Sequence, residues 1–474
     1  MAEISQSQKA NLHEVAQLML EIYETLSQMR YFETKAIQKG PHDITKMRPV
    51  YEKHGLDPAI IYLYSILPYV DSDITANTSF FDGGIFADFR RESHVEEARD
   101  PLCLGPSDGG DYEDEDGPYM HPWMTALSLM GIRTSVIIYD ARKHRIWIPH
   151  PEDEWSYDPA LNDEPNEAPQ SNNENSFEHL PSRPAGEVLQ DIARWYRELE
   201  LLPGGGENSG VEWDTGDLDK KGLYLMHGWP DNFDGIAFQV NQQRALCVIN
   251  IKHDTKQILP QLRRCMIAVE ESSRTISRLQ KSLAAAKSKN EEWIIRMELW
   301  KAGRSHRRNS KELVEGELKV NALEYRQANK ELKSLQDRIR RTRKWLEEES
   351  KDADADTVKR IQGDLYREEQ RAILYEAVKM VIEADTNRLR NEGLRGKTAF
   401  AKEKEAAIGQ GVSLHFAGEL EALRKWAAQI PDDAKDAKEK VNEQIQDYER
   451  SVAATTAHTW LNSPRLFDPF HCDL

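Results

Sequence analysis

An apolar residue recurs at alternating steps of four and three along residues 258–300, and no other feature constrains the fold as strongly. Eleven of the thirteen positions in this frame are apolar, and only Ser272 and Asn290 are polar. Such a heptad repeat places apolar side chains on one face of a helix, where they pack against another helix as in a coiled coil. The pattern predicts one long helix with this seam: Ile258, Leu262, Cys265, Val269, Ile276, Leu279, Leu283, Ala286, Trp293, Met297 and Trp300.

A second seam runs through residues 314–346, after a break at Gly303 and the polar stretch 304–310. Its apolar positions include Leu332, Leu335, Ile339 and Leu346, whereas Asn321 and Thr342 interrupt it. We therefore expect the chain to reverse direction at 303–310. The result is an antiparallel helical hairpin over 255–350, with helices of about 60–70 Å, in which Ser272 and Asn290 are candidate register setters.

Further helices are expected over 351–460, beginning with a weaker seam at 358–382 and continuing at about 400–429 and 433–457, and an irregular tail is expected at 461–474. The weak third seam favours packing of these helices on the first two, in a bundle within one chain. Pairing of residues 256–350 between two chains, as a homo-oligomer, stays open.

Residues 1–254 have the composition of an acidic globular domain. Lys and Arg number 21 and Asp and Glu 44 in residues 1–255, a net charge of −23; the remainder carries 42 and 37, a net of +5. Such an acidic region repels nucleic acid and anionic membranes, so either partner would have to contact the rest of the chain. The simpler interpretation is that the acidic residues keep the protein soluble.

The first domain mixes helix and strand patterns. Apolar residues at helical spacing predict helices at 10–32, 58–67 and 185–202, and the runs 133–140 and 144–149 predict a β-hairpin. The stretch 151–184 is polar and rich in proline, so we expect an acidic disordered insertion there. The fold class is therefore α+β: an acidic α/β domain with a small antiparallel sheet, followed by the helical arm.

No cofactor or metal site is predicted. The acidic loop 108–117 has no frame that matches a calcium-binding loop, and Gly-Lys-Thr at 396–398 lacks the glycine that a phosphate-binding loop needs at position 391. The four cysteines are widely spaced, no signal peptide is evident, and no apolar run is long enough to cross a bilayer. We expect a cytoplasmic or nuclear protein.

Two alternative functions rest on dispersed residues. His121, Asp140, His227 and Asp231 are of types that could form an acid–base site, although no nucleophile motif accompanies them. The basic cluster at 304–308 and another at 338–344 could contact nucleic acid, but the flanks of a charged coiled coil explain them equally well. We therefore do not expect nucleic acid as a partner, and catalysis stays as an alternative to protein binding.

The order of elements in residues 10–202 resembles the SUKH superfamily, which includes bacterial immunity proteins and a yeast regulator of cell-wall synthesis. The resemblance rests on a helix ending at Leu67-Pro68, the segment Phe-Phe-Asp-Gly-Gly at 80–84, the hairpin at 137–148 and the helix at 185–199, and the insertion at 151–184 departs from it. The whole layout also resembles uncharacterised filamentous-fungal proteins. Both resemblances imply a non-catalytic domain that binds protein.

The sequence thus favours a protein-interaction or scaffold protein whose arm docks or self-associates. Aromatic residues next to glycine-rich turns are the expected contact points, because buried aromatic anchors dominate interface energies. We expect these side chains to be exposed, with a place in the domain core as the alternative: Phe80, Phe81, His227, Trp229 and Phe233.

Overall fold

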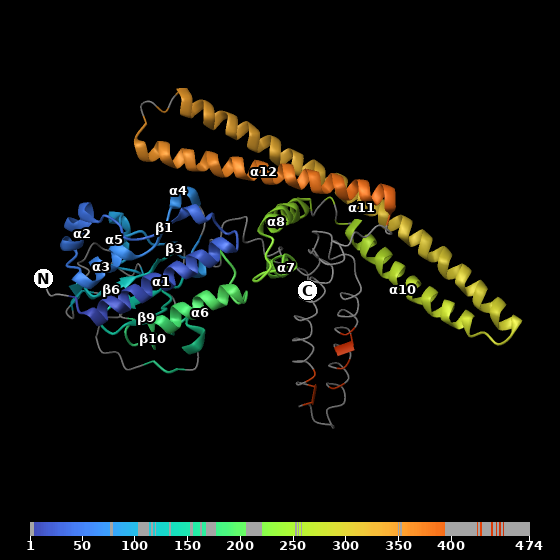
Figure 1. Cartoon of the computed structure of the whole chain (residues 1–474), viewed down its shortest axis with the longest axis horizontal. Coiled ribbons are helices and arrows are strands. Elements are labelled where there is room, and N and C mark those ends of the chain that lie inside the picture. Colours follow the sequence, from blue (N-terminus) through green and yellow to red (C-terminus); the bar gives the residue numbers. More distant parts are fainter. Residues whose placement is uncertain are drawn as a thin grey trace. The chain divides into compact units, whose positions relative to one another are not determined.

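The computed structural model divides the chain into two compact units, shown in Figure 1. One unit comprises Met1–Thr215 and Asp352–Tyr366, and the other comprises Gly216–Lys351 and Arg367–Leu474. The residues that the structure describes are 4–75, 79–102, 113–114, 117–118, 120–131, 134–151, 155–161, 164–166, 177–204, 220–251, 254, 256, 258–348, 350, 353–393, 424, 427–428, 438, 442, 445–446 and 449.

Three of the helices that the sequence predicts are present in the first unit. They are α1 (Gln6–Gln28), α3 (Pro58–Ile66) and α6 (Ala185–Arg197). Asp57 caps α3 by accepting a hydrogen bond from the Ala59 backbone at 2.9 Å, and proline occupies the first turn, as expected for a helix start. The helices α1 and α6 approach closely at Gly186, where an added Cβ would lie 2.7 Å from Glu14 Oε1.

The predicted β-hairpin is confirmed as β8 (Ile138–Asp140) and β9 (Arg145–Trp147). The turn between them is held by Asp140, whose Oδ1 accepts backbone hydrogen bonds from Arg142 at 2.6 Å and Lys143 at 2.9 Å. The four-stranded antiparallel sheet has the order β10-β9-β8-β6, in which β6 is Met124–Ala126 and β10 is Arg183–Pro184.

Shorter elements complete this unit. They are η1 (Thr34–Ala36), β1 (Ile37–Gln38), η2 (Thr45–Met47), α2 (Arg48–Lys53), β2 (Tyr69–Val70), α4 (Ser72–Thr75), η3 (Phe81–Gly83), β3 (Ile85–Phe86), α5 (Glu92–Glu97), β4 (Glu113–Asp114), β5 (Gly117–Pro118), β7 (Ser128–Leu129) and η4 (Pro159–Leu161). Strand β1 pairs with β2, β3 with β7, and β4 with β5, all antiparallel.

The expectation that residues 151–184 are disordered was wrong for the parts of this stretch that the structure describes. Phe177 and Leu180 are buried, and Trp147 donates a hydrogen bond from Nε1 to the Leu180 carbonyl at 3.1 Å. Arg183 forms an ion pair with the buried Asp158 at 2.7 Å. A few apolar anchors and one buried ion pair therefore hold a segment whose average composition is polar.

The second unit is helical and begins with α7 (Lys220–Met226) and α8 (Gly235–Asn250). From the sequence we assigned this region to the N-terminal domain, whereas the structure groups it with the helical arm. The reason is that Val240 and Cys247 of α8 belong to the same apolar cluster as Leu332.

The predicted long antiparallel helical arm is confirmed. Helix α10 (Ile258–Ala284) packs along α11 (Lys289–Glu348), a helix of 60 residues that spans about 90 Å (Figure 1). The two helices pack closely at Gly316, since an added Cβ would lie 2.2 Å from Leu262 Cδ2.

The position predicted for the reversal was wrong. The chain turns at 285–288, and α11 continues without interruption through Gly303 and 304–310. Ser288 caps the new helix by accepting a hydrogen bond from the Glu291 backbone at 3.2 Å, and Glu291 reaches back to the Lys287 backbone at 3.0 Å. This Ser-x-x-Glu capping box is a helix-start signal, whereas one glycine inside a helix costs only about 1 kcal/mol.

Helix α12 (Ala355–Glu392) contributes its residues from Arg367 onward to this unit. There its Tyr375, Val378 and Ile382 form an apolar cluster with Ala328, Leu332 and Leu335 of α11. Helix α11 therefore pairs with α10 along its first part and with α12 along its second part. The helices predicted at 400–429 and 433–457 and the tail at 461–474 fall almost entirely outside the residues that the structure describes.

Candidate interaction surfaces of the helical arm

The aromatic residues at 80–81 lie in the core of the first unit. Phe80 and Phe81 are buried, and the Phe80 ring stacks on Phe86 at 5.0 Å and meets Tyr23 edge-on at 5.4 Å. The expectation that these two side chains are exposed was therefore wrong. The glycines beside them allow the chain to turn tightly, and the turn directs both rings inward.

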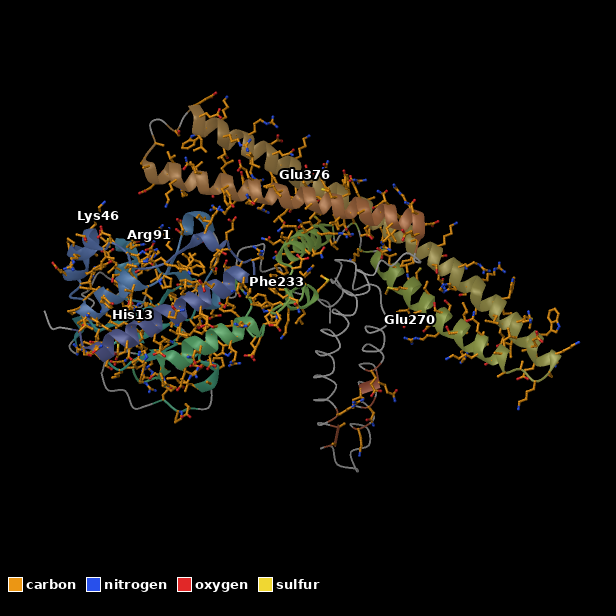
Figure 2. The ribbon with its side chains drawn as sticks, viewed as in Figure 1. His13, Lys46, Arg91, Phe233, Glu270 and Glu376 are labelled. Atoms are coloured by element: carbon orange, nitrogen blue, oxygen red, sulfur yellow. The ribbon has the colours of Figure 1, made fainter. Side chains whose placement is uncertain are left out.

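The aromatic turn at 227–235 is also packed inward. Trp229 and His227 are buried, and Phe233 is half-buried against Phe238, with ring centroids 5.3 Å apart. Figure 2 labels Phe233 near α7 and α8. Gly228 has a φ of +82°, and an added Cβ would lie 2.5 Å from the Asn232 carbonyl oxygen, so only glycine fits there. The expectation of exposure was wrong for His227 and Trp229, because the tight turn folds both rings onto α7 and α8.

The residues of the alternative acid–base site occupy two different units. His121 contacts Glu178 at 3.1 Å, and Asp140 holds the β8–β9 turn, both in the first unit. His227 shares a 3.0 Å hydrogen bond with Asn241, and Asp231 is exposed, both in the second unit. Each residue other than Asp231 thus has a local structural contact.

The first predicted seam is divided by the turn at 285–288. On α10, Leu262 and Leu279 are buried, whereas four other predicted seam positions there are half-buried: Ile258, Val269, Ile276 and Leu283. The frame does not continue in phase across the turn, so Ile295, rather than Trp293 or Met297, is buried on the first turns of α11. The prediction that Trp293 and Met297 lie in the seam was wrong for this reason.

The second seam follows α11 toward α12. Leu332, Leu335 and Ile339 are buried, and Leu346 is half-buried. Of the two predicted register setters, Ser272 hydrogen-bonds His306 of α11 at 3.1 Å, whereas Asn290 is exposed.

Four large apolar side chains near the reversal of the hairpin face solvent. Their exposed fractions are 74% for Trp293, 49% for Ile294, 53% for Met297 and 58% for Trp300. At about 100° per residue these positions lie within about 120° of one another, on the side of α11 opposite the buried Ile295. We call Trp293, Ile294, Met297 and Trp300 the tip stripe.

A buried polar network lies where α8, α11 and α12 meet. Arg244 of α8 forms an ion pair with Glu324 of α11 at 2.8 Å, and both side chains are almost completely buried. Asn321 of α11 accepts a hydrogen bond from Arg244 at 3.3 Å and donates one to Asp385 of α12 at 3.1 Å. We call Arg244, Asn321, Glu324 and Asp385 the junction network.

The electrostatics of the junction network keep Asp385 charged. Burial raises the pKa of Asp385, but the positive charge of Arg244 and hydrogen bonds from Arg388 and Asn321 outweigh it and hold this pKa below its usual value. Sequence reasoning identified only Asn321, as an interruption of the second seam. The charged partners carried no separate signal, because their spacing matches that of ordinary helix-surface residues.

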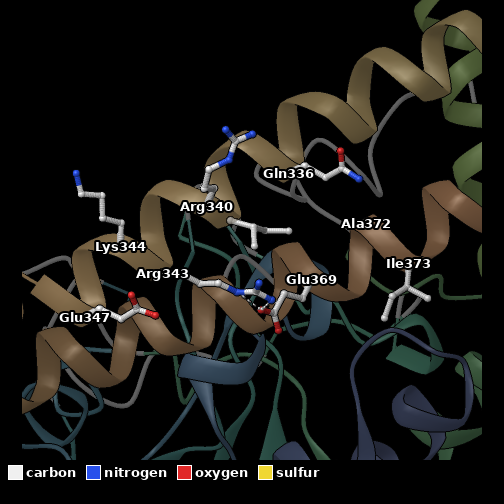
Figure 3. Close-up of a pocket in the computed structure, with 9 residues that line it drawn as sticks. Gln336, Arg340, Arg343, Lys344, Glu347, Glu369, Ala372 and Ile373 are labelled. Atoms are coloured by element: carbon white, nitrogen blue, oxygen red, sulfur yellow. Dashed lines mark hydrogen bonds and ion pairs between the residues drawn. The ribbon is translucent and has the colours of Figure 1, made fainter.

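The second basic cluster borders a shallow groove of about 760 Å³ between α11 and α12. Arg343 reaches across it to Glu369 at 2.7 Å, whereas Arg340 and Lys344 point away from α12 (Figure 3). Arg340 pairs with Asp337 at 2.7 Å and Lys344 with Glu348 at 3.6 Å. Neighbouring carboxylates therefore offset the positive charge that a nucleic-acid backbone would need.

Two further observations concern the described part of the chain. It holds no group of three or more His, Cys, Asp or Glu side chains placed to bind a metal ion. None of its helices combines the length and the apolar character required to cross a bilayer.

Comparison with known proteins gives no relative: no family model, curated protein or solved structure matches the chain. The resemblance to the SUKH superfamily and to filamentous-fungal proteins therefore stays a prediction from the sequence.

Proposed function

We propose that the protein is a non-catalytic interaction or scaffold protein, that its helical arm is the docking element, and that the tip stripe is the contact surface. The observation that carries this proposal is the exposure of Trp293, Met297 and Trp300 on one face of α11. The hairpin does not need these side chains for its own packing, because Ile295 and Leu313 face inward on the same helix.

The chemistry of the tip stripe suits protein binding. Tryptophan is enriched among the residues that contribute most binding energy at interfaces, and methionine adapts to irregular apolar partners. Contiguous exposed apolar side chains rimmed by charged residues are typical of interaction sites. In this proposal the junction network holds α11 in one position relative to α8 and α12. The expected compartment, cytoplasm or nucleus, stays a prediction from the sequence.

Photo-cross-linking tests this proposal. A benzophenone amino acid is placed at Trp300 in the full chain, expressed in cells of the source organism, and the adducts are identified by mass spectrometry. Met380 of α12 is the matched control, because its side chain is 69% exposed but lies outside the tip stripe. We expect protein adducts at position 300 and few at position 380. Equal labelling at both positions, or none at 300, would contradict the proposal.

A further inference from the structure

We infer that the partner of the tip stripe is a second copy of this chain, docked antiparallel about a two-fold axis. This inference rests on the proposed function and specifies its partner. In such a symmetric interface the same surface of each copy contacts the other, so one patch has to complement itself.

The charges around the tip stripe favour the antiparallel arrangement. Residues 289–298 contain two basic and three acidic residues, a net charge of −1, whereas residues 299–308 contain four basic residues and no acidic one, a net charge of +4. A parallel pair would place the two strongly basic halves side by side. An antiparallel pair places each basic half beside the slightly acidic half of the other copy, which reduces the repulsion.

One register satisfies the apolar and charged residues together. When the two helices cross near residues 298–299, Met297 lies beside Trp300 of the second copy, and Glu298 lies on the same flank as Lys301 of the second copy, about 3 Å from it along the helix axis. The same register places Trp293 against Arg304 of the second copy, where a guanidinium can lie over the indole ring. Within one chain Arg304 already lies 5.7 Å from the centre of the Trp300 ring, so this pairing of residue types suits the surface.

The size of the surface predicts a weak dimer. Residues 289–308 extend about 30 Å along a helix face about 10 Å wide, so the surface measures about 300 Å², well below the roughly 800 Å² per partner of a standard interface. We therefore expect a dissociation constant on the order of 10 μM.

Sedimentation velocity of the full chain between about 1 and 200 μM tests the inference, because this range brackets the expected dissociation constant. We expect dimer to form as the concentration rises. Glu298→Lys and Lys301→Glu each place like charges together twice in a symmetric dimer, so each raises the dissociation constant about tenfold. Mixing the two variants restores both opposite-charge pairs and brings the constant back to within about threefold of the original. Both positions are exposed, and circular dichroism confirms that the variants remain helical.

Three results would overturn the inference. They are a chain that stays monomeric at 200 μM, charge reversals that leave the dimer unchanged, and a mixture that does not recover. If position 300 then cross-links to a different protein, the proposed function stands and the second copy is the wrong partner. Binding to anionic phospholipid vesicles that Trp293→Gln abolishes, together with a monomeric chain, would identify a lipid surface instead and contradict both proposals.

Discussion

Two stretches of α11 place their side chains in opposite ways. Around Asn321 and Glu324 polar and charged side chains are buried, whereas from Trp293 to Trp300 large apolar side chains are exposed. Both stretches belong to one continuous helix, so helix formation itself does not account for the difference. The neighbouring helices account for it: within the described residues, α8 and α12 enclose the first stretch, and α10 packs on the side of α11 opposite the exposed side chains of the second.

Apolar side chains are usually buried and charged ones exposed, and the two stretches depart from this rule with different consequences. A buried polar network contributes little net stability compared with an apolar core of the same shape, but it favours the single arrangement in which every group is paired. Exposed tryptophans contribute almost nothing to the fold of their own chain and are available to a partner. Substitutions in the two stretches and their surroundings should therefore differ widely in their effect on the free energy of unfolding.

Arg244→Met should destabilise the second unit by about 3–5 kcal/mol. It removes the cation that pairs with Glu324 at 2.8 Å and leaves that carboxylate buried without its main partner. Urea unfolding followed by circular dichroism measures the loss. The double variant Arg244→Met/Glu324→Leu should recover most of it, since no uncompensated charge is left. A single variant that loses less than about 1 kcal/mol would show that the junction network does not hold α8 on α11.

Leu335→Ala should cost about 2–4 kcal/mol, because its side chain is buried in the cluster that joins α11 to α12. Met380→Ala is the matched control on α12, since its side chain is exposed and its loss should change the free energy of unfolding by less than about 0.5 kcal/mol. Both are measured by the same urea titration. Equal effects would mean that the apolar cluster is not the core of this part of the arm.

The sequence predicted the antiparallel arm, the β8–β9 hairpin and the buried positions Leu332, Leu335 and Ile339. These depend on local spacing, which a periodic pattern reports directly. The reversal at 285–288 was missed because Gly303 and its polar neighbours resemble a loop more than the capping box at Ser288 does. The wrong reversal then assigned Trp293 and Met297 to a seam, although the turn had already shifted the helix to another phase.

The candidate site was harder to predict than the fold. Exposure depends on which helix covers which face, and no single-helix pattern contains that information. Phe80 and Trp229 show the same limit, because a glycine-rich turn directs an aromatic ring inward or outward depending on its neighbours. Among the members of the junction network, only Asn321 stood out, since a polar residue at a seam position is unusual.

Asp385→Asn should reduce the sensitivity of the second unit to acid. The pKa of Asp385 is lowered in the folded state, so its contribution to stability is complete above its unfolded pKa of about 3.9 and is lost as the pH falls below that value. At pH 7, where the variant lacks this charge, its free energy of unfolding should be about 1–2 kcal/mol lower than that of the original chain. Between pH 5 and pH 3 the free energy of unfolding should fall less in the variant than in the original chain. Urea unfolding at pH 7, 5 and 3 compares the two. Parallel pH profiles would show that Asp385 is not ionised within the junction network.

Trp293→Gln/Trp300→Gln should change the free energy of unfolding by less than about 0.5 kcal/mol, the smallest effect of the four, because both side chains are more than half exposed. Urea unfolding should be measured at a protein concentration of about 1 μM, which is below the expected dissociation constant of the dimer. At this concentration self-association does not add to the stability of the original chain. A loss above about 1 kcal/mol at this concentration would mean that the tryptophans are packed within the chain. The tip stripe would then be part of the core, and the contrast between the two stretches of α11 would disappear. If the free energy of unfolding changes little but no dimer forms at 200 μM, the two tryptophans serve binding and not the folding of their own chain.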